Sequence, residues 1–230
     1  MLLLLTLACA DPEPVGFTLK LSNLSSPGEG LATDGTAYDL AFAPGLVVVH
    51  SPEFRLFAVG EASPYAELEA LAEDGEPTRL ATALGAEPDV HSTGFLQYTN
   101  EVDYEAAPMG PGASAYTTAD IAADQRFSVL FMYGQSNDVI IAGLGLAAFD
   151  PERAALDVDL ASSFHFYDLG TELNQEPGVG ADQAPRQSAP GEGAAEDVPV
   201  EQIIGTDDEG YTYPESAELL SLALYPTAAD

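Results

Sequence analysis

Alternating apolar and polar residues recur along the chain in short runs, each bounded by glycine, proline or other turn residues. An alternation with a period of two is typical of β-strands that bury one face. Residues 126–133 carry large apolar side chains on both alternating faces, which predicts a central strand. Strand-like runs occupy residues 15–21, 46–49, 55–59, 114–118, 126–133, 139–141, 144–149, 156–166, 198–204 and 219–224.

One segment shows the signals of a helix instead. Ser63 can cap its beginning, Pro64 fits the first helical position, and Gly75 suits its end. Leu68 and Leu71 share one face of this helix. The acids of the segment are expected to form a solvated face: Glu67, Glu69 and Glu73.

Residues 78–112 show a poor pattern, in which 80–84 and 94–98 suggest only short elements. About eight or nine strands with a single convincing helix predict an all-β fold, an antiparallel β-sandwich with one short helical insertion and long loops. A chain of 230 residues is long enough for one large β domain with a substantial core. The segment 176–199, rich in Pro, Gly, Ala and Gln, predicts a long loop across one end of the sandwich.

The start of the chain resembles an export signal. Its apolar run is far shorter than the ~20 residues of a transmembrane helix. Leu-Ala-Cys before Ala10 resembles a bacterial lipoprotein cleavage site, at which Cys9 would be lipidated. The positively charged start of a signal peptide is missing, so we interpret residues 1–9 as an incomplete leader, followed by a linker at 10–14 and one domain at 15–230. An ordinary signal peptide with an incidental cysteine is the alternative.

The charge balance narrows the classes of partner. Asp and Glu number 38 against 6 Lys and Arg, which gives a formal net charge of −32. Nucleic acid and anionic membrane surfaces repel such a protein, so we expect contact with a membrane only through a lipid anchor. A hydrophobic content of 46% argues against disorder, because the chain can still bury a core. The acid excess indicates either a saline habitat or a compositional bias of the proteome.

Support for catalysis is thin. His50, His91 and His165 lie far apart in the sequence and lack metal-ligand spacing, and no serine lies in a nucleophile-elbow motif. Cys9 is expected to be processed rather than to act as a nucleophile, and as the lone cysteine it excludes an intramolecular disulfide. Pairs of carboxylates of the glycosidase type cannot be inferred by counting among 38 acids. We therefore do not predict an enzyme.

A binding site for a hard cation has better support. Asp168 and Glu172 flank a Gly-Thr pair where a predicted strand ends, and Gly170 lets the backbone turn back. The turn at Ser136-Asn137-Asp138 would reach the same end of the sheet if the predicted strand 144–149 lies between the two connections. Calcium is favoured over zinc because no histidine or cysteine accompanies the acids, and over magnesium because loop ligands suit an irregular coordination sphere. The alternative is that Asp138 and Asp168 only cap turns through their own backbone amides.

Several blocks of the sequence carry a family resemblance. They are Asp-Leu-Gly-Thr-Glu at 168–172, Asn-Gln-Glu-Pro-Gly at 174–178, Gln-Ala-Pro-Arg-Gln at 183–187, and the stretches 51–57, 68–75 and 136–138. In this order they resemble the spondin domain, in the form found in bacterial spondin-domain proteins, and the likeness covers roughly residues 15–225 of this chain. The resemblance implies a β-sandwich with a bound calcium ion and a role in extracellular adhesion, hence binding rather than catalysis.

The resemblance also implies the metal ligands. Asp138, Asp168 and Glu172 match the positions of the metal site in that family. Animal members usually have a proline and a tryptophan around the first aspartate, whereas this chain has Asn137 and Val139 and contains no tryptophan. Partner surfaces known from the animal proteins are therefore not carried over.

We predict an exported, cell-surface binding or adhesion module, secreted or lipid-anchored in a bacterial envelope, with calcium stabilising one loop end. Its ligand would be an extracellular protein or polysaccharide. The alternatives are a secreted carbohydrate-active enzyme on a β-sandwich and a structural envelope protein. Two carboxylates across an open groove would favour the enzyme, whereas a single acid cluster around an ion would favour the binding module.

Overall fold

The structure is a computed structural model that describes residues 12–99 and 106–227. The leader at 1–9, with the predicted lipidation residue Cys9, lies outside the described residues. Antiparallel sheets dominate, with 38% of the chain in strands and 10% in helices, which confirms the predicted all-β, sandwich-like class. None of the described helices is both long enough and apolar enough to span a membrane.

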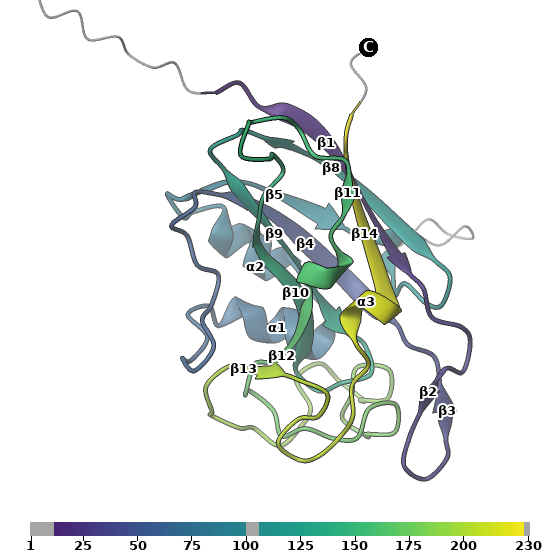
Figure 1. Cartoon of the computed structure of the whole chain (residues 1–230). Coiled ribbons are helices and arrows are strands. Elements are labelled where there is room, and N and C mark those ends of the chain that lie inside the picture. Colours follow the sequence, from purple (N-terminus) through teal and green to yellow (C-terminus); the bar gives the residue numbers. More distant parts are fainter. Residues whose placement is uncertain (1–11, 100–105, 228–230) are drawn as a thin grey trace, which may run out of the picture.

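Two sheets form the body of the molecule (Figure 1). The four-stranded sheet has the order β11 (Val158–Asp159), β14 (Leu220–Pro226), β1 (Val15–Asn23), β8 (Ser114–Ile121). The six-stranded sheet has the order β13 (Glu201–Ile203), β12 (His165–Asp168), β10 (Val139–Leu146), β9 (Arg126–Tyr133), β4 (Phe42–His50), β5 (Val90–Leu96). Two short ribbons pair β2 (Gly30–Leu31) with β3 (Ala37–Tyr38), and β6 (Tyr98–Thr99) with β7 (Ala106–Ala107).

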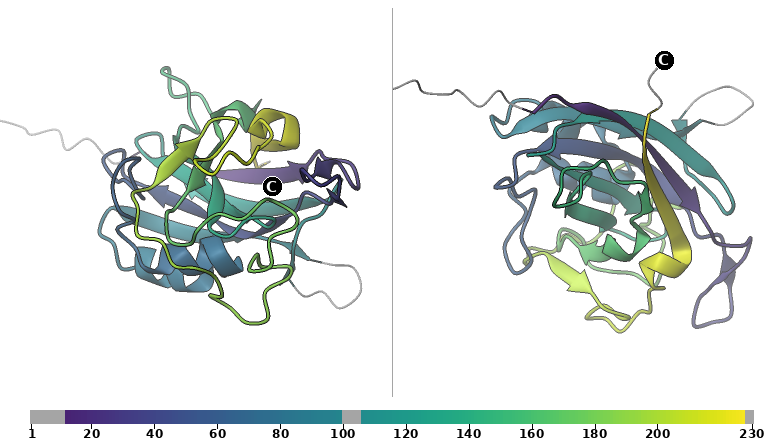
Figure 2. Two further views of the ribbon diagram at one scale, coloured as in Figure 1. Left: turned by 90° about the horizontal axis from the view of Figure 1, so that it is seen from below. Right: turned by 45° about the horizontal axis from the view of Figure 1, so that its top comes forward.

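The central strands of the six-stranded sheet, β10, β9 and β4, are buried on both faces. One face packs on the four-stranded sheet, where β1 contributes Phe17 and Leu19 to the core. The other face is covered by the helices α1 (Glu67–Asp74) and α2 (Thr78–Leu84), which bury Leu68 and Leu80 against it. Figure 2 shows these layers, with the helices and the four-stranded sheet on opposite sides of the larger sheet. All but the first residue of β9 is buried, as predicted for a central strand.

The helical region differs from the prediction in two ways. The first helix begins at Glu67 rather than near Ser63, and it ends at the predicted Gly75, which has a left-handed φ of 65°. A second helix, α2, occupies a segment where the sequence suggested only a short element. The carboxylate of Glu76 accepts hydrogen bonds from the first backbone amides of α2, at Thr78 (2.9 Å) and Arg79 (3.3 Å), and so supplies the missing cap.

The predicted strand at residues 55–59 is wrong, because this segment is a loop. Consecutive residues there, Leu56 and Phe57, are both buried beside the helices instead of alternating between two faces. Arg55 also donates from Nη1 to the backbone carbonyls of Pro52 (2.8 Å) and Phe54 (2.7 Å). These bonds hold the chain in a turn, so its carbonyls are not available to a neighbouring strand.

Two other predictions change in detail. Residues 139–141 and 144–149 were expected to be separate strands, but they largely merge into β10, with an irregularity in register between Gly143 and Leu146. The predicted strand 156–166 divides into β11, a 3₁₀ turn at Ala161–Ser163 and β12. The chain passes from one sheet to the other at this turn.

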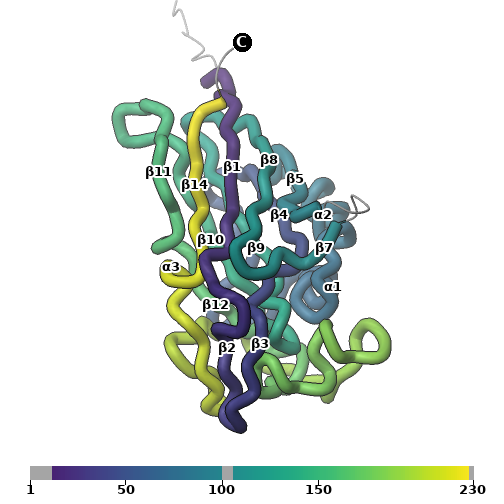
Figure 3. The backbone as a smooth tube through the Cα atoms, turned by 90° about the vertical axis from the view of Figure 1, so that its right-hand side faces the viewer, coloured from purple at the N-terminus to yellow at the C-terminus, as the bar shows by residue number. Residues whose placement is uncertain are grey.

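The first and last described strands lie side by side. β1 pairs with β14 from Phe17↔Pro226 to Asn23↔Leu220, and β8 lies on its other edge (Figure 3). The start of β1 and the end of β14 therefore share one end of the sandwich. The long connections after β12 gather at the other end (Figure 1).

Candidate functional site

The structure brings the three predicted ligands to one end of the six-stranded sheet. β10 and β12 pair directly and antiparallel, with Val139 opposite Asp168. This register places the turn before β10, which carries Asp138, beside the loop after β12, which carries Glu172. The convergence was predicted, but the strand expected between the two connections is the second half of β10 rather than a separate strand.

Asp138 is the most deeply buried of the three, with no exposed surface. Its Oδ2 accepts hydrogen bonds from the backbone amides of Thr171 (2.7 Å) and Glu172 (3.0 Å) and from the Thr171 hydroxyl (3.1 Å). Its Oδ1 is buried without a hydrogen-bond partner. Burial raises the pKa of this carboxyl group, and the bonds to Oδ2 oppose that shift.

Asp168 stands at the end of β12 and shapes the loop behind it. Its Oδ1 accepts a hydrogen bond from the Gly170 amide (2.7 Å), and its Oδ2 accepts one from Nδ2 of Asn174. Gly170 has a φ of 66°, and a Cβ there would collide with the carbonyl oxygen of Val198. Burial, followed by the charge of Asp138, raises the pKa of Asp168 to about 7.

The amide of Asn174 was not singled out in the sequence. Only 4% of the residue is exposed, and its Oδ1 is buried without a partner although Nδ2 binds Asp168. Asn174 therefore adds a neutral oxygen to the same group of side chains. A polar side chain in a glycine-rich loop carries no sequence signal that separates such a buried amide from a solvated one.

Glu172 is also buried, with 5% of its surface exposed. Its Oε2 accepts a hydrogen bond from Nδ2 of Asn137 (3.3 Å). The pKa of Glu172 is raised to about 7, mainly by burial and then by the charge of Asp138, with Asn137 acting in the opposite direction. Asn137 thus becomes a partner of the third predicted ligand.

Glu73 is a fourth member that we expected on a solvated helix face, and that prediction is wrong. The last turn of α1 lies against the loop, and Glu73 is only 5% exposed. Its Oε1 accepts a hydrogen bond from the Thr171 hydroxyl (2.8 Å), and burial is the main cause that raises its pKa to about 7. Glu73 lies off the face defined by Leu68 and Leu71, so helical periodicity could not reveal its burial.

The hydroxyl of Thr171 links two of these carboxylates. It lies within hydrogen-bond distance of Glu73 Oε1 and of Asp138 Oδ2. A hydroxyl carries a single proton, so it can donate to only one of them. The second contact requires a proton on a carboxyl group or a cation that offsets the repulsion between the oxygens.

The loop after the site is fixed to the sheet by side chains. The amide of Gln175 donates to Oδ1 of Asn137 (3.0 Å), and the guanidinium of Arg186 donates to Oε1 of Gln135 (3.1 Å). Gln183 is fully buried and donates to the carbonyl oxygen of Gln175 (3.0 Å). The Gln-Ala-Pro-Arg-Gln block thus anchors the long loop that the composition predicted.

More acids surround this end. Asp168 lines a cavity of about 260 Å³, whose other acidic lining residues are Glu196, Glu201, Asp208 and Glu209. Burial raises the pKa of Glu196, and the charges of Glu209, Asp138 and Asp208 raise it further. The buried group of carboxylates is therefore connected, through Asp168, with a cavity whose other acids lie nearer the surface.

The donor chemistry of this group fits calcium, but its geometry is not that of a closed metal site. Across residues 12–99 and 106–227, no three or more His, Cys, Asp or Glu side chains are arranged to hold an ion together. The oxygens left over are those of Asp138 Oδ1 and Asn174 Oδ1. Carboxylate and amide oxygens are the ligands that calcium prefers. The alternative of turn capping holds for Asp168, whose Oδ1 accepts a hydrogen bond from the amide of Gly170 two residues later. It does not hold for Oδ2 of Asp138, which accepts its hydrogen bonds from the loop at Thr171 and Glu172.

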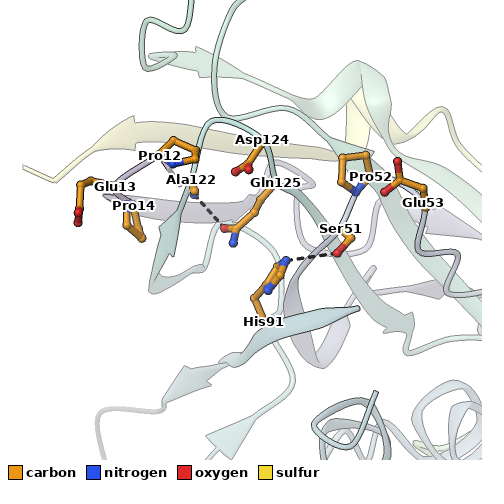
Figure 4. Close-up of a pocket in the computed structure, with 10 residues that line it drawn as sticks. All are labelled: Pro12, Glu13, Pro14, Ser51, Pro52, Glu53, His91, Ala122, Asp124 and Gln125. Atoms are coloured by element: carbon orange, nitrogen blue, oxygen red, sulfur yellow. Dashed lines mark hydrogen bonds between the residues drawn. The ribbon is translucent and has the colours of Figure 1, made fainter. Parts of the chain in front are cut away.

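The three histidines occupy separate environments. His50 is buried, while His91 and His165 are exposed on β5 and β12. A cavity of about 610 Å³ lies beside His91, whose Nε2 is 3.4 Å from Oγ of Ser51 (Figure 4). The acids that line this cavity are Glu13, Glu53 and Asp124. It is formed by the turns around Ser51 and Asp124, away from the predicted ligands.

A scan of the chain against models of known protein families finds no match, and a search of curated proteins finds no relative. The family resemblance therefore stays a prediction that depends on the sequence blocks alone.

Proposed function

We propose that this protein is an extracellular binding module of the spondin type, in which a calcium ion fixes the acidic loop end. The observation that carries the proposal is the pair of buried oxygens without partners, Asp138 Oδ1 and Asn174 Oδ1, beside Asp168 and Glu172. A buried polar atom left without a partner costs about 1–3 kcal/mol. A divalent cation among these oxygens would satisfy them and offset the repulsion between the carboxylates.

The residues that would hold the ion are Asp138, Asp168 and Glu172, with the amide oxygen of Asn174; because the three acids are not arranged around a common point in this structure, binding would have to draw them closer together. When bound, calcium supplies positive charge and a flexible shell of oxygen ligands. Thr171 orients Asp138 through its backbone amide and its hydroxyl. These contacts tie the loop to the turn before β10, so the ion would stabilise both segments at once.

The proposed role is adhesion to an extracellular protein or polysaccharide. A loop surface that is already ordered loses less conformational entropy when a ligand binds. The start of β1 lies at the opposite end of the sandwich from the acidic loops (Figure 1). A lipid anchor at Cys9 would therefore leave the acidic loop end directed away from the bacterial envelope.

Calcium-dependent stability tests the proposal. We expect calcium to raise the melting temperature at fixed ionic strength and chelation to lower it, because a ligand of the folded state at a hundredfold excess over its Kd stabilises by ~2.7 kcal/mol. Asp138→Asn should remove the response. Asp124→Asn, which removes one charge at the other cavity, should retain it. An equal response in both variants, or none in the wild type by calorimetry, would contradict the proposal.

A further inference from the structure

A third cavity lies on the helix-covered face of the six-stranded sheet, at the start of β9. It has a volume of about 290 Å³, and Arg55 and Arg126 both line it. These are two of the six basic residues in the sequence, and no acid among residues 12–99 and 106–227 lines this cavity. In a chain of net charge −32, the overall composition would lead us to expect acids around any cavity, so a cavity lined by two arginines stands out.

The two arginines reach the cavity from different segments. Arg126 begins β9, where it pairs in register with His50 of β4, and Arg55 belongs to the loop that follows β4. Nη1 of Arg126 donates to the carbonyl oxygen of Gln125 (2.9 Å), and Nη1 of Arg55 donates to two backbone carbonyls. Within residues 12–99 and 106–227, neither guanidinium donates to a carboxylate. Each guanidinium has five N–H groups, so donors remain for a ligand.

The polar floor of the cavity is neutral. Nδ1 of His50 lies 2.8 Å from the carbonyl oxygen of Ser51, which fixes the proton on Nδ1 and lets the Ser128 hydroxyl donate to Nε2 (2.9 Å). The amide of Gly145 donates to the same Ser128 oxygen (3.0 Å). Burial lowers the pKa of His50, and the charges of Arg55 and Arg126 lower it further. The charges of both arginines therefore reach His50. The polar residues at the base of the cavity carry no negative charge that would repel an anion.

We propose that this cavity binds an oxyanion, the carboxylate or sulfate group of a small ligand, between Arg55 and Arg126. Guanidinium groups match both anions through paired N–H donors, and such charge-assisted bonds are strong where water is partly excluded. The apolar side of the cavity, lined by Phe54, Phe57 and Leu144, would receive the carbon skeleton of the ligand. The site lies away from the acidic loops and does not depend on the calcium proposal.

Titration with simple anions tests the site. Sodium sulfate and sodium acetate would be added separately to the full chain at constant ionic strength, with the amide of Gly145 and the side chain of Arg126 followed by NMR. We expect saturable shifts at both positions. Arg126→Gln should weaken binding roughly tenfold or more, because it removes the fork and its charge. Arg79→Gln, which removes one charge from α2, should leave binding unchanged.

The two anions separate the possible ligand shapes. Saturable binding of sulfate alone would indicate a ligand with a tetrahedral group, and binding of acetate alone would indicate a planar carboxylate. Binding of both would indicate a site that recognises negative charge rather than shape. Each of these three results supports the proposal. If Arg126→Gln does not fold, Arg126→Lys keeps the charge without the fork and should still weaken binding. Shifts that stay linear for both anions, or equal affinity in the wild type and the folded Arg126 variant, would overturn it.

Discussion

Arg126 begins β9, and the turn beyond the far end of the same strand carries Asp138. The strand separates a cavity lined by arginines from a loop end crowded with carboxylates by roughly 25 Å. At the first end, the buried polar groups are neutral and satisfy one another, as His50, Ser128 and Gly145 do. At the second end, buried acids share donors and leave oxygens unpaired. The polar groups below the arginine cavity form all their hydrogen bonds with one another and need no further partner. The group of acids, in contrast, would be stabilised by a proton or a cation.

The largest difference between the two ends should appear when Asp138 is changed to Ala. Oδ2 of Asp138 is the acceptor for the amides of Thr171 and Glu172, and both would lose it inside the protein. We expect the free energy of unfolding to fall by about 3 kcal/mol, the cost of buried donors left unpaired. Urea unfolding in the presence of a chelator would measure it, with Asp124→Ala as the control. A loss no greater than that of the control would mean that Asp138 does not organise the loop end.

The pH dependence of stability should also differ between the ends. At the acid end, burial raises the pKa values of Glu73, Asp168 and Glu172 to about 7 in the folded protein, above their ordinary values of 4.5, 3.8 and 4.5. Their stabilising contribution is present in full below pH ~4 and is lost as the pH rises toward and through 7, because the folded state binds more protons in that window. Each group changes stability by at most about 1.4 kcal/mol per pH unit.

Chelator-treated protein should therefore be less stable toward denaturant at pH 8 than at pH 5. Glu73→Gln, which keeps the contact to Thr171 without a titrating group, should reduce the slope. Hydrogen exchange at the Gly145 amide should show the opposite trend, since His50 has a lowered pKa and its contribution is lost as the pH falls below its ordinary 6.5. Parallel pH profiles at the two ends would remove the distinction between them.

The smallest effect should come from Ser128→Ala at the arginine end. The change removes the hydrogen bonds of Ser128 Oγ with Nε2 of His50 and with the Gly145 amide. We expect a loss of about 1–2 kcal/mol, because the partners lie beside a cavity and water can replace the hydroxyl. Thermal unfolding of this variant beside Asp138→Ala would show whether the order is right. The reverse order would identify the neutral floor as the more essential of the two networks.

The sequence predicted the fold class well because period-two alternation depends on local chemistry. The alternating face of β1 and the doubly buried β9 could be recognised in this way. Asp168 and Glu172 could be singled out because they flank a Gly-Thr pair at the end of a predicted strand, and Asp138 because its turn matches the family resemblance. Glu73 and Asn174 could not, since their burial depends on how α1 and the loop pack together.

The arginine cavity was also beyond prediction. Arg126 was seen only as the first residue of a strand, and residues 55–59 were expected to form another strand. The register between β4 and β9 pairs His50 with Arg126, and the turn after β4 then brings Arg55 to the same place. Long-range register is set by the whole sheet, so local patterns could not indicate that these charges meet.

The pairing of β1 with β14 has a consequence for how the protein is made (Figure 3). β1 leaves the ribosome early, but one of its two neighbours is the last strand of the described chain. Contacts between segments so distant in sequence form late and slowly. The smaller sheet therefore cannot be completed during most of synthesis. If the protein is exported as proposed, this delay would keep the nascent polypeptide open long enough to be threaded through a translocation channel, and the sandwich would close on the far side.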